Sequence, residues 1–178
     1  MTALPVSWNE PQASELPPIY CVTVGVGIGK TEVAIQNIAA HCLNPTSNIK
    51  VIYAVPRHKL GDELVARFKK AGVTSGVWRG RAADNTARTG SAMCLKPEAV
   101  QKVIALGLPV QKTMCRDAGI SLCEHFLSCP YQRQAAELCD MHVVIVPHES
   151  LFYEMPNIGE RKLLVIDESF WPAGLKGL

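Results

Sequence analysis

The sequence lacks the features of several common protein classes. No uninterrupted apolar run approaches the roughly 20 residues of a membrane-spanning helix, so no membrane is expected as a partner. The N-terminus has no basic start followed by an apolar block, which argues against a secretory signal and predicts an intracellular, cytoplasmic protein. The net charge is only +2, so any contact with nucleic acid must come from a local basic patch rather than from a global field.

What is present is the composition of an ordinary globular protein. Of the 178 residues, 48% are hydrophobic and 19% are charged, and a chain of this length buries one good core. Residues 1–18 contain repeated prolines and are expected to form an irregular lead-in. We therefore expect one domain over residues 19–178, with a cysteine-rich insert at about residues 93–130.

Short apolar runs alternate with amphipathic segments along this domain. Apolar, β-rich runs predict strands, and a period of 3.6 residues predicts helices. Such an alternation predicts an α/β fold with a parallel sheet covered on both faces, in which ligands bind at the carboxyl ends of the strands. The predicted strands are 19–24, 50–55, 72–78, 141–146 and 163–166, and the predicted helices are 31–42, 58–70, 97–106 and 131–138.

A glycine-rich loop joins the first predicted strand to the first predicted helix. Gly25, Gly27 and Gly29 allow successive backbone N–H groups to face a phosphate, and the helix adds its positive end. Lys30 is then placed to reach the β- and γ-phosphates, and the Thr31 hydroxyl is placed to bind Mg²⁺. The alternative is a glycine turn beside a chance lysine, but a position between a buried strand and a helix favours the phosphate loop.

Two carboxylates close the last predicted strand. Asp167 follows four apolar residues, so the strand would hold it at the sheet edge that faces the phosphate loop. There Asp167 would bind Mg²⁺, directly or through water, and Glu168 would polarise the attacking water. By itself, an Asp-Glu pair after a strand is more often a solvated helix cap, and the upstream loop reverses that preference. Lys30, Asp167 and Glu168 are therefore the candidate catalytic residues of an ATP-hydrolysing site.

Four of the seven cysteines lie in the insert, spaced as Cys94-x20-Cys115-x7-Cys123-x5-Cys129. Four thiolates in a loop-rich stretch of an intracellular chain suit a closed Zn²⁺ site or an iron–sulfur cluster. His125 is an alternative ligand to one of them. The other interpretation, buried apolar side chains, is the one we prefer for the remaining cysteines. These are Cys21, Cys42 and Cys139.

In order and spacing, residues from about Ile19 to Phe170 resemble the first motor lobe of a superfamily 1/2 helicase. Gly27-Ile28-Gly29-Lys30-Thr31 matches the second half of the A/G-x-x-G-x-G-K-T loop, and Asp167-Glu168-Ser169-Phe170 resembles the D-E-x-x box. The resemblance implies a RecA-like P-loop NTPase lobe that couples ATP hydrolysis to translocation along nucleic acid. It also implies a second RecA-like lobe or a continuation of the native chain as partner, so we expect the isolated chain to hydrolyse ATP weakly or not at all.

Basic residues at two places are candidate nucleic-acid contacts. The segment from Tyr53 to Leu60 stands where helicase motif Ia follows the second strand and, by that resemblance, touches the phosphate backbone. The second place lies beside Trp78, where arginines and an aromatic ring suit single-stranded nucleic acid. Helix capping and solvated charge explain these residues equally well or better. The candidates are Arg57, His58, Lys59, Arg79 and Arg81.

The position of the cysteine insert, between motif Ia and the acidic box, resembles that in XPD/DinG-type iron–sulfur DNA helicases. This resemblance favours a cluster over zinc and DNA over RNA. The leading hypothesis is thus the ATP-binding first lobe of a DNA helicase. A second hypothesis is a nucleotide- and metal-binding DNA-interaction module without turnover. A third, a small-molecule kinase-like P-loop enzyme, is disfavoured by the cysteine insert and the motif Ia-like segment.

Overall fold

The structure is a computed structural model that describes residues 18–22, 29–47, 49–56, 58–153 and 158–168. The chain divides into two compact units, residues 1–30 and 31–178, and the sheet lies in the second. Within the described part of the chain, no helix has the length and apolar character that a membrane crossing requires.

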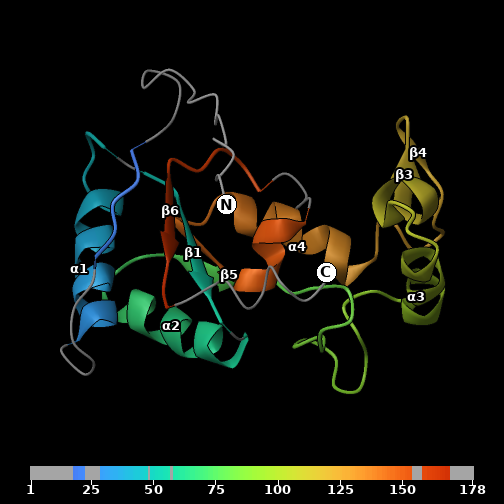
Figure 1. Cartoon of the computed structure of the whole chain (residues 1–178), viewed down its shortest axis with the longest axis horizontal. Coiled ribbons are helices and arrows are strands. Elements are labelled where there is room, and N and C mark those ends of the chain that lie inside the picture. Colours follow the sequence, from blue (N-terminus) through green and yellow to red (C-terminus); the bar gives the residue numbers. More distant parts are fainter. Residues whose placement is uncertain (1–17, 23–28, 48, 57, 154–157, 169–178) are drawn as a thin grey trace, which may run out of the picture. The chain divides into compact units, whose positions relative to one another are not determined.

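A four-stranded parallel sheet forms the centre of the second unit (Figure 1). The strands lie in the order β2-β5-β1-β6, so the chain crosses over between every pair of neighbours. This arrangement confirms the predicted α/β fold with a parallel sheet. The strands are β1 (Val51–Val55), β2 (Ser75–Val77), β5 (Val143–Pro147) and β6 (Leu163–Ile166).

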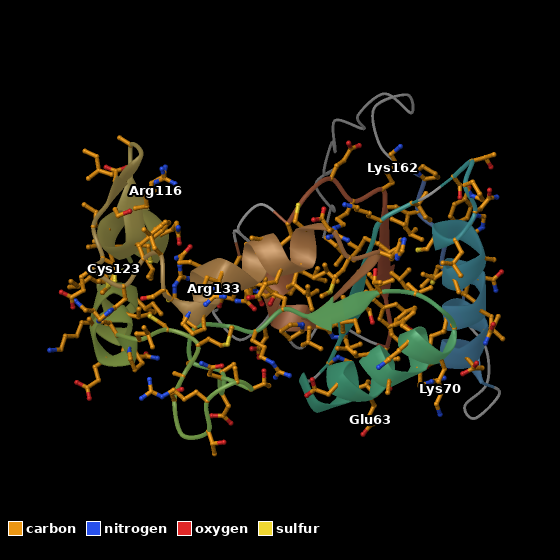
Figure 2. The ribbon with its side chains drawn as sticks, turned by 180° about the vertical axis from the view of Figure 1, so that it is seen from behind. Glu63, Lys70, Arg116, Cys123, Arg133 and Lys162 are labelled. Atoms are coloured by element: carbon orange, nitrogen blue, oxygen red, sulfur yellow. The ribbon has the colours of Figure 1, made fainter. Side chains whose placement is uncertain are left out.

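Helices cover the sheet because the central strands are apolar on both faces. Val143 and Ile145 of β5 pack into the core cluster that also contains residues of α1 (Lys30–Cys42) and α2 (His58–Lys70). Val144 and Val146 pack into a second cluster with Leu138 of α4 (Pro130–Cys139). Alternate residues of a strand point to opposite faces, so one strand serves both cores. In Figure 2, Glu63 and Lys70 lie on the outer side of α2, in agreement with their exposure.

The insert contains elements that hydrophobic periodicity does not predict. The predicted helix near 97–106 is present as α3 (Pro97–Ala105), and a π-helical turn, Gln111–Cys115, follows it. Strands β3 (Arg116–Asp117) and β4 (Ile120–Ser121) form an antiparallel hairpin, and Figure 2 marks Arg116 on β3 and Cys123 just after β4. Ala118 and Gly119 link them with φ of 45° and 87°, the left-handed backbone that a tight two-residue hairpin turn requires.

The predicted buried strand over residues 19–24 is not formed in its described part. Residues 18–22 have no regular secondary structure, and Ile19, Tyr20 and Val22 are 90%, 84% and 78% exposed. Residues 23 and 24 lie outside the described residues. The prediction was wrong here because apolar, β-rich composition does not suffice: a strand forms only where a neighbouring strand completes its backbone hydrogen bonds.

Arg161 ties the end of α4 to the approach to β6. Its guanidinium donates to the carbonyl oxygens of Leu138 at 2.8 Å, Met141 at 2.6 Å and Ile158 at 2.8 Å. The last carbonyls of a helix have no partner within the helix, so a cation that binds them is favourable. The side chain of Arg161 is half-buried, and this burial lowers the pKa of its guanidinium from the ordinary value.

We expect Arg161→Met to lower the free energy of unfolding by about 2–4 kcal/mol, because several partly buried carbonyls lose a charged donor at once. The measurement is urea denaturation followed by circular dichroism. Arg133→Met is the matched control, because Arg133 is exposed and its ion pair with Glu137 is long at 3.9 Å. Its loss should change the free energy of unfolding by less than about 0.5 kcal/mol. Equal losses in the two variants would contradict the role assigned to Arg161.

Candidate functional site

Two residues of the predicted nucleotide site, one from each of its motifs, meet at the carboxyl end of β6. The Thr31 hydroxyl, in the first turn of α1, donates to Asp167 Oδ2 at 3.1 Å, although the two residues are 136 positions apart in sequence. The Asp167 amide donates to the Ala54 carbonyl at 3.0 Å and so continues the pairing of β1 with β6 by one residue. Thr31 and Asp167, both predicted Mg²⁺ ligands, thus lie in direct contact.

Two further groups hold Asp167, and neither is among the predicted site residues. The Tyr53 hydroxyl, on β1, donates to the same Oδ2 atom at 2.8 Å. Burial, followed by the contact with Asp167, raises the pKa of Tyr53 far above its ordinary value, so the phenol stays protonated and remains a donor. His148 Nε2 lies 2.9 Å from the Asp167 carbonyl oxygen; because a carbonyl only accepts, this nitrogen carries the hydrogen. Tyr53 lies in a predicted buried strand, and a buried tyrosine hydroxyl needs a hydrogen-bond partner. This requirement is the signal in the sequence that could have identified Tyr53 as a site residue.

Only the end of the predicted phosphate loop lies among the described residues. Gly29 has φ +79°, a left-handed conformation that glycine adopts without strain, and α1 begins at the next residue, Lys30. Lys30 is exposed and Thr31 is half-buried. Gly25 and Gly27 lie outside the described residues. The described end of the loop therefore has the backbone that a sharp entry into a helix requires.

Glu168, the predicted base, has an unusual backbone. It is exposed, and its φ is +66°, in the left-handed region where a side chain costs about 1–2 kcal/mol. Strain of this kind tends to occur where a side chain must be aimed in one direction. The strained residue follows Asp167 directly, so the chain turns sharply at the end of β6.

The four cysteines predicted as metal ligands line one pocket of the insert, together with His125. Cys94, Cys115 and Cys129 are buried and Cys123 is half-buried, and all four thiols are free. Among the described residues, no group of three or more cysteine, histidine or acidic side chains is arranged closely enough to hold a metal ion. The pocket therefore gathers the predicted donors without bringing them to bonding distance of one centre. Burial raises the pKa of the Cys94 thiol, with smaller contributions from the neighbouring thiols Cys129 and Cys115.

Arg81 lies beside this cysteine pocket. Its guanidinium carbon is 4.1 Å from the centre of the Tyr131 ring, and its Nη2 donates to Gln111 Oε1 at 2.8 Å. The same nitrogen lies 3.9 Å from Cys115 Sγ, while Nε is buried and has no partner among the described residues. A cation at this place is well suited to a pocket that becomes negative when its thiols ionise.

The other predicted nucleic-acid contacts are placed as follows. Arg79 pairs with Asp62 of α2 at 2.5 Å, and Trp78 is 2% exposed with its ring edge against another aromatic residue, so the idea that Trp78 stacks on a base was wrong. His58 and Lys59 form the start of α2, whereas Arg57 lies outside the described residues. The structure thus gives Arg79 and Arg81 partners within the protein.

Comparison with protein-family models, with curated proteins and with solved structures found no significant match.

The strain at Glu168 leads to a stability prediction. We expect Glu168→Gly to raise the free energy of unfolding by about 0.5–1 kcal/mol, because glycine adopts φ +66° without steric cost. The gain is smaller than the full strain, since glycine also makes the unfolded chain more flexible. Thermal or urea denaturation measures this change. Glu168→Ala removes the same carboxylate and keeps the strain, so it should give no gain. A gain of equal size in the alanine variant would show that charge, and not backbone strain, is responsible.

Proposed function

We propose that this chain is the ATP-binding first motor lobe of a DNA helicase-like protein, with a RecA-like P-loop arrangement. In this proposal it couples ATP hydrolysis to movement along nucleic acid once a second lobe completes the site. The observation that carries the proposal is the contact between Thr31 and Asp167. Hydroxyl and carboxylate oxygens are the ligands that Mg²⁺ prefers, and one residue belongs to the phosphate loop while the other opens the acidic pair.

The donors present fit a magnesium-bound triphosphate. Lys30 directly precedes Thr31 at the start of α1, where the helix end favours a negative group. In our proposal Lys30 binds the β- and γ-phosphates, and Thr31 and Asp167 hold Mg²⁺. Glu168 accepts a proton from the attacking water. Bound Mg²⁺ would supply neutralisation of the charge that develops on the phosphate oxygens.

In our proposal the four cysteines of the insert hold a thiolate-bound metal group. Four thiols around one pocket are the ligand set of a closed zinc site or of an iron–sulfur cluster. A single zinc ion needs every sulfur at about 2.3 Å from one centre, and the described side chains are not arranged in this way. The choice of a cluster over zinc therefore rests on the resemblance to iron–sulfur helicases and not on the arrangement of these side chains.

Lys30→Ala tests the nucleotide site. We expect the variant to lose nucleotide binding by at least about 100-fold, because the phosphates lose their only charged donor from the loop motif. Titration of the full chain with a fluorescent ATP analogue in the presence of Mg²⁺ measures this. Lys70→Ala is the matched control, since Lys70 lies on the outer side of α2 (Figure 2) and should leave binding unchanged. Unchanged affinity in the Lys30 variant would overturn the phosphate-loop assignment.

Steady-state hydrolysis with and without single-stranded DNA distinguishes the motor from the module without turnover. The motor hypothesis predicts that DNA raises the rate of phosphate release, even from a low basal value, and that Glu168→Gln abolishes this release while nucleotide binding persists. Nucleotide binding with no DNA-stimulated release by the unmodified chain would favour the module instead.

Cys123→Ser tests the metal group. The unmodified protein, purified without oxygen, is expected to be brown, with absorbance near roughly 400 nm and several irons per chain. Replacement of Cys123 should remove most of this absorbance and iron, because a ligand is lost. Cys139→Ser is the control, since Cys139 belongs to α4 and does not line the pocket. A colourless protein that contains one zinc per chain would replace the cluster with a zinc site.

A further inference from the structure

Tyr53 donates a hydrogen bond to the carboxylate of Asp167, and the proposed chemistry gives this hydroxyl no role. We propose that Tyr53 is a positioning residue: its hydroxyl fixes the orientation of the Asp167 carboxylate and so sets the affinity of the site for Mg²⁺. This inference rests on the proposed function, because it takes Asp167 to be the Mg²⁺-binding carboxylate.

The tyrosine is held rigidly by its surroundings. Its side chain is 1% exposed, and its ring packs edge-on against Phe68 of α2, with centroids 5.8 Å apart and planes at 75°. It stands in β1 opposite Val165 of β6, two residues before Asp167. A ring buried in this core cluster and packed against Phe68 delivers its hydroxyl to one place, and that place is Asp167 Oδ2 at 2.8 Å. The donor is therefore preorganised by the core.

Binding of a cation should affect the hydrogen bonds from Tyr53 and Thr31 to Asp167 differently. In this structure both hydroxyls donate to Oδ2. A hydroxyl that binds Mg²⁺ turns its lone pair towards the ion, so Thr31 can no longer hold the carboxylate in the same way. Tyr53 then remains the side-chain donor on Oδ2. With this oxygen fixed, rotation of the carboxylate is restricted, and less entropy is lost when the cation binds.

A purely structural role for the hydroxyl makes a different prediction. A hydroxyl that only satisfies its own hydrogen-bonding need would affect stability and leave the Mg²⁺ dependence unchanged. A positioning role must appear in the Mg²⁺ dependence of nucleotide binding. The two roles are therefore separated by measuring both quantities on the same variant.

The test is Tyr53→Phe in the full chain, which keeps the ring and removes the hydroxyl. The Mg²⁺ concentration that half-saturates binding of a fluorescent ATP analogue should rise roughly five- to tenfold, the loss expected for one hydrogen bond to a charged group. Nucleotide binding without Mg²⁺ should stay within about twofold. Tyr131→Phe is the matched control, since Tyr131 is also a buried tyrosine with an edge-on aromatic partner, Trp78, but lies in the other core cluster.

A second variant covers the case in which Tyr53→Phe folds poorly. Incorporation of 3-fluorotyrosine at position 53 keeps the hydroxyl and makes it a stronger donor, so half-saturation should occur at the same or a lower Mg²⁺ concentration. An unchanged Mg²⁺ response in Tyr53→Phe, with normal binding by the unmodified protein, overturns the inference alone. If the unmodified protein shows no Mg²⁺-dependent nucleotide binding, the proposed function fails as well.

Discussion

The site depends on how the end of β6 is held against β1. In the described residues β6 pairs with β1 alone, and Leu163 and Leu164 remain 38% and 49% exposed, so packing contributes less to its position than it does for the central strands. The position of Asp167 is fixed instead by four hydrogen bonds. Its amide donates to Ala54, its carboxylate accepts from Tyr53 and Thr31, and its carbonyl accepts from His148. The partners come from three elements, so β1, α1 and the 3-10 helix His148–Phe152 that follows β5 together determine where the carboxylate lies.

The core also directs Thr31 towards this point. Four residues of α1 are buried, and they follow Thr31 at helical spacings of 4, 7, 8 and 11 residues: Ile35, Ile38, Ala39 and Cys42. Residues at these spacings share one face of a helix. Packing of that face against Tyr53, Val143 and their neighbours therefore turns the Thr31 hydroxyl to the sheet edge. The same apolar pattern that forms the helix thus sets the geometry of the candidate Mg²⁺ site.

Periodicity predicted most of the fold because the central strands and the amphipathic helices bury long apolar stripes. The predicted strands over 50–55, 141–146 and 163–166 are present within a few residues, and the meeting of Thr31 with Asp167 follows from the rule that parallel strands present ligands at their carboxyl ends. The strand over 19–24 was wrong where it is described, because pairing is a property of neighbours and not of composition. Tyr53 was missed because, in the sequence, an aromatic residue in a strand looks like any other core residue. Only the structure shows that its hydroxyl bonds to Asp167.

The cysteine pocket shares the second core with the sheet. Cys129 directly precedes α4, it is buried, and its thiol donates to the Met93 carbonyl at 3.7 Å. Met93 and Tyr131 belong to the same cluster as Val144 and Val146 of β5. At the other end of α4 the carbonyl of Cys139 accepts a hydrogen bond from Lys50 at 2.8 Å, next to the start of β1. This ten-residue helix thus begins beside a predicted metal ligand and ends in contact with Lys50, the residue before the strand that carries Tyr53. Its packing fixes one wall of the pocket relative to the sheet.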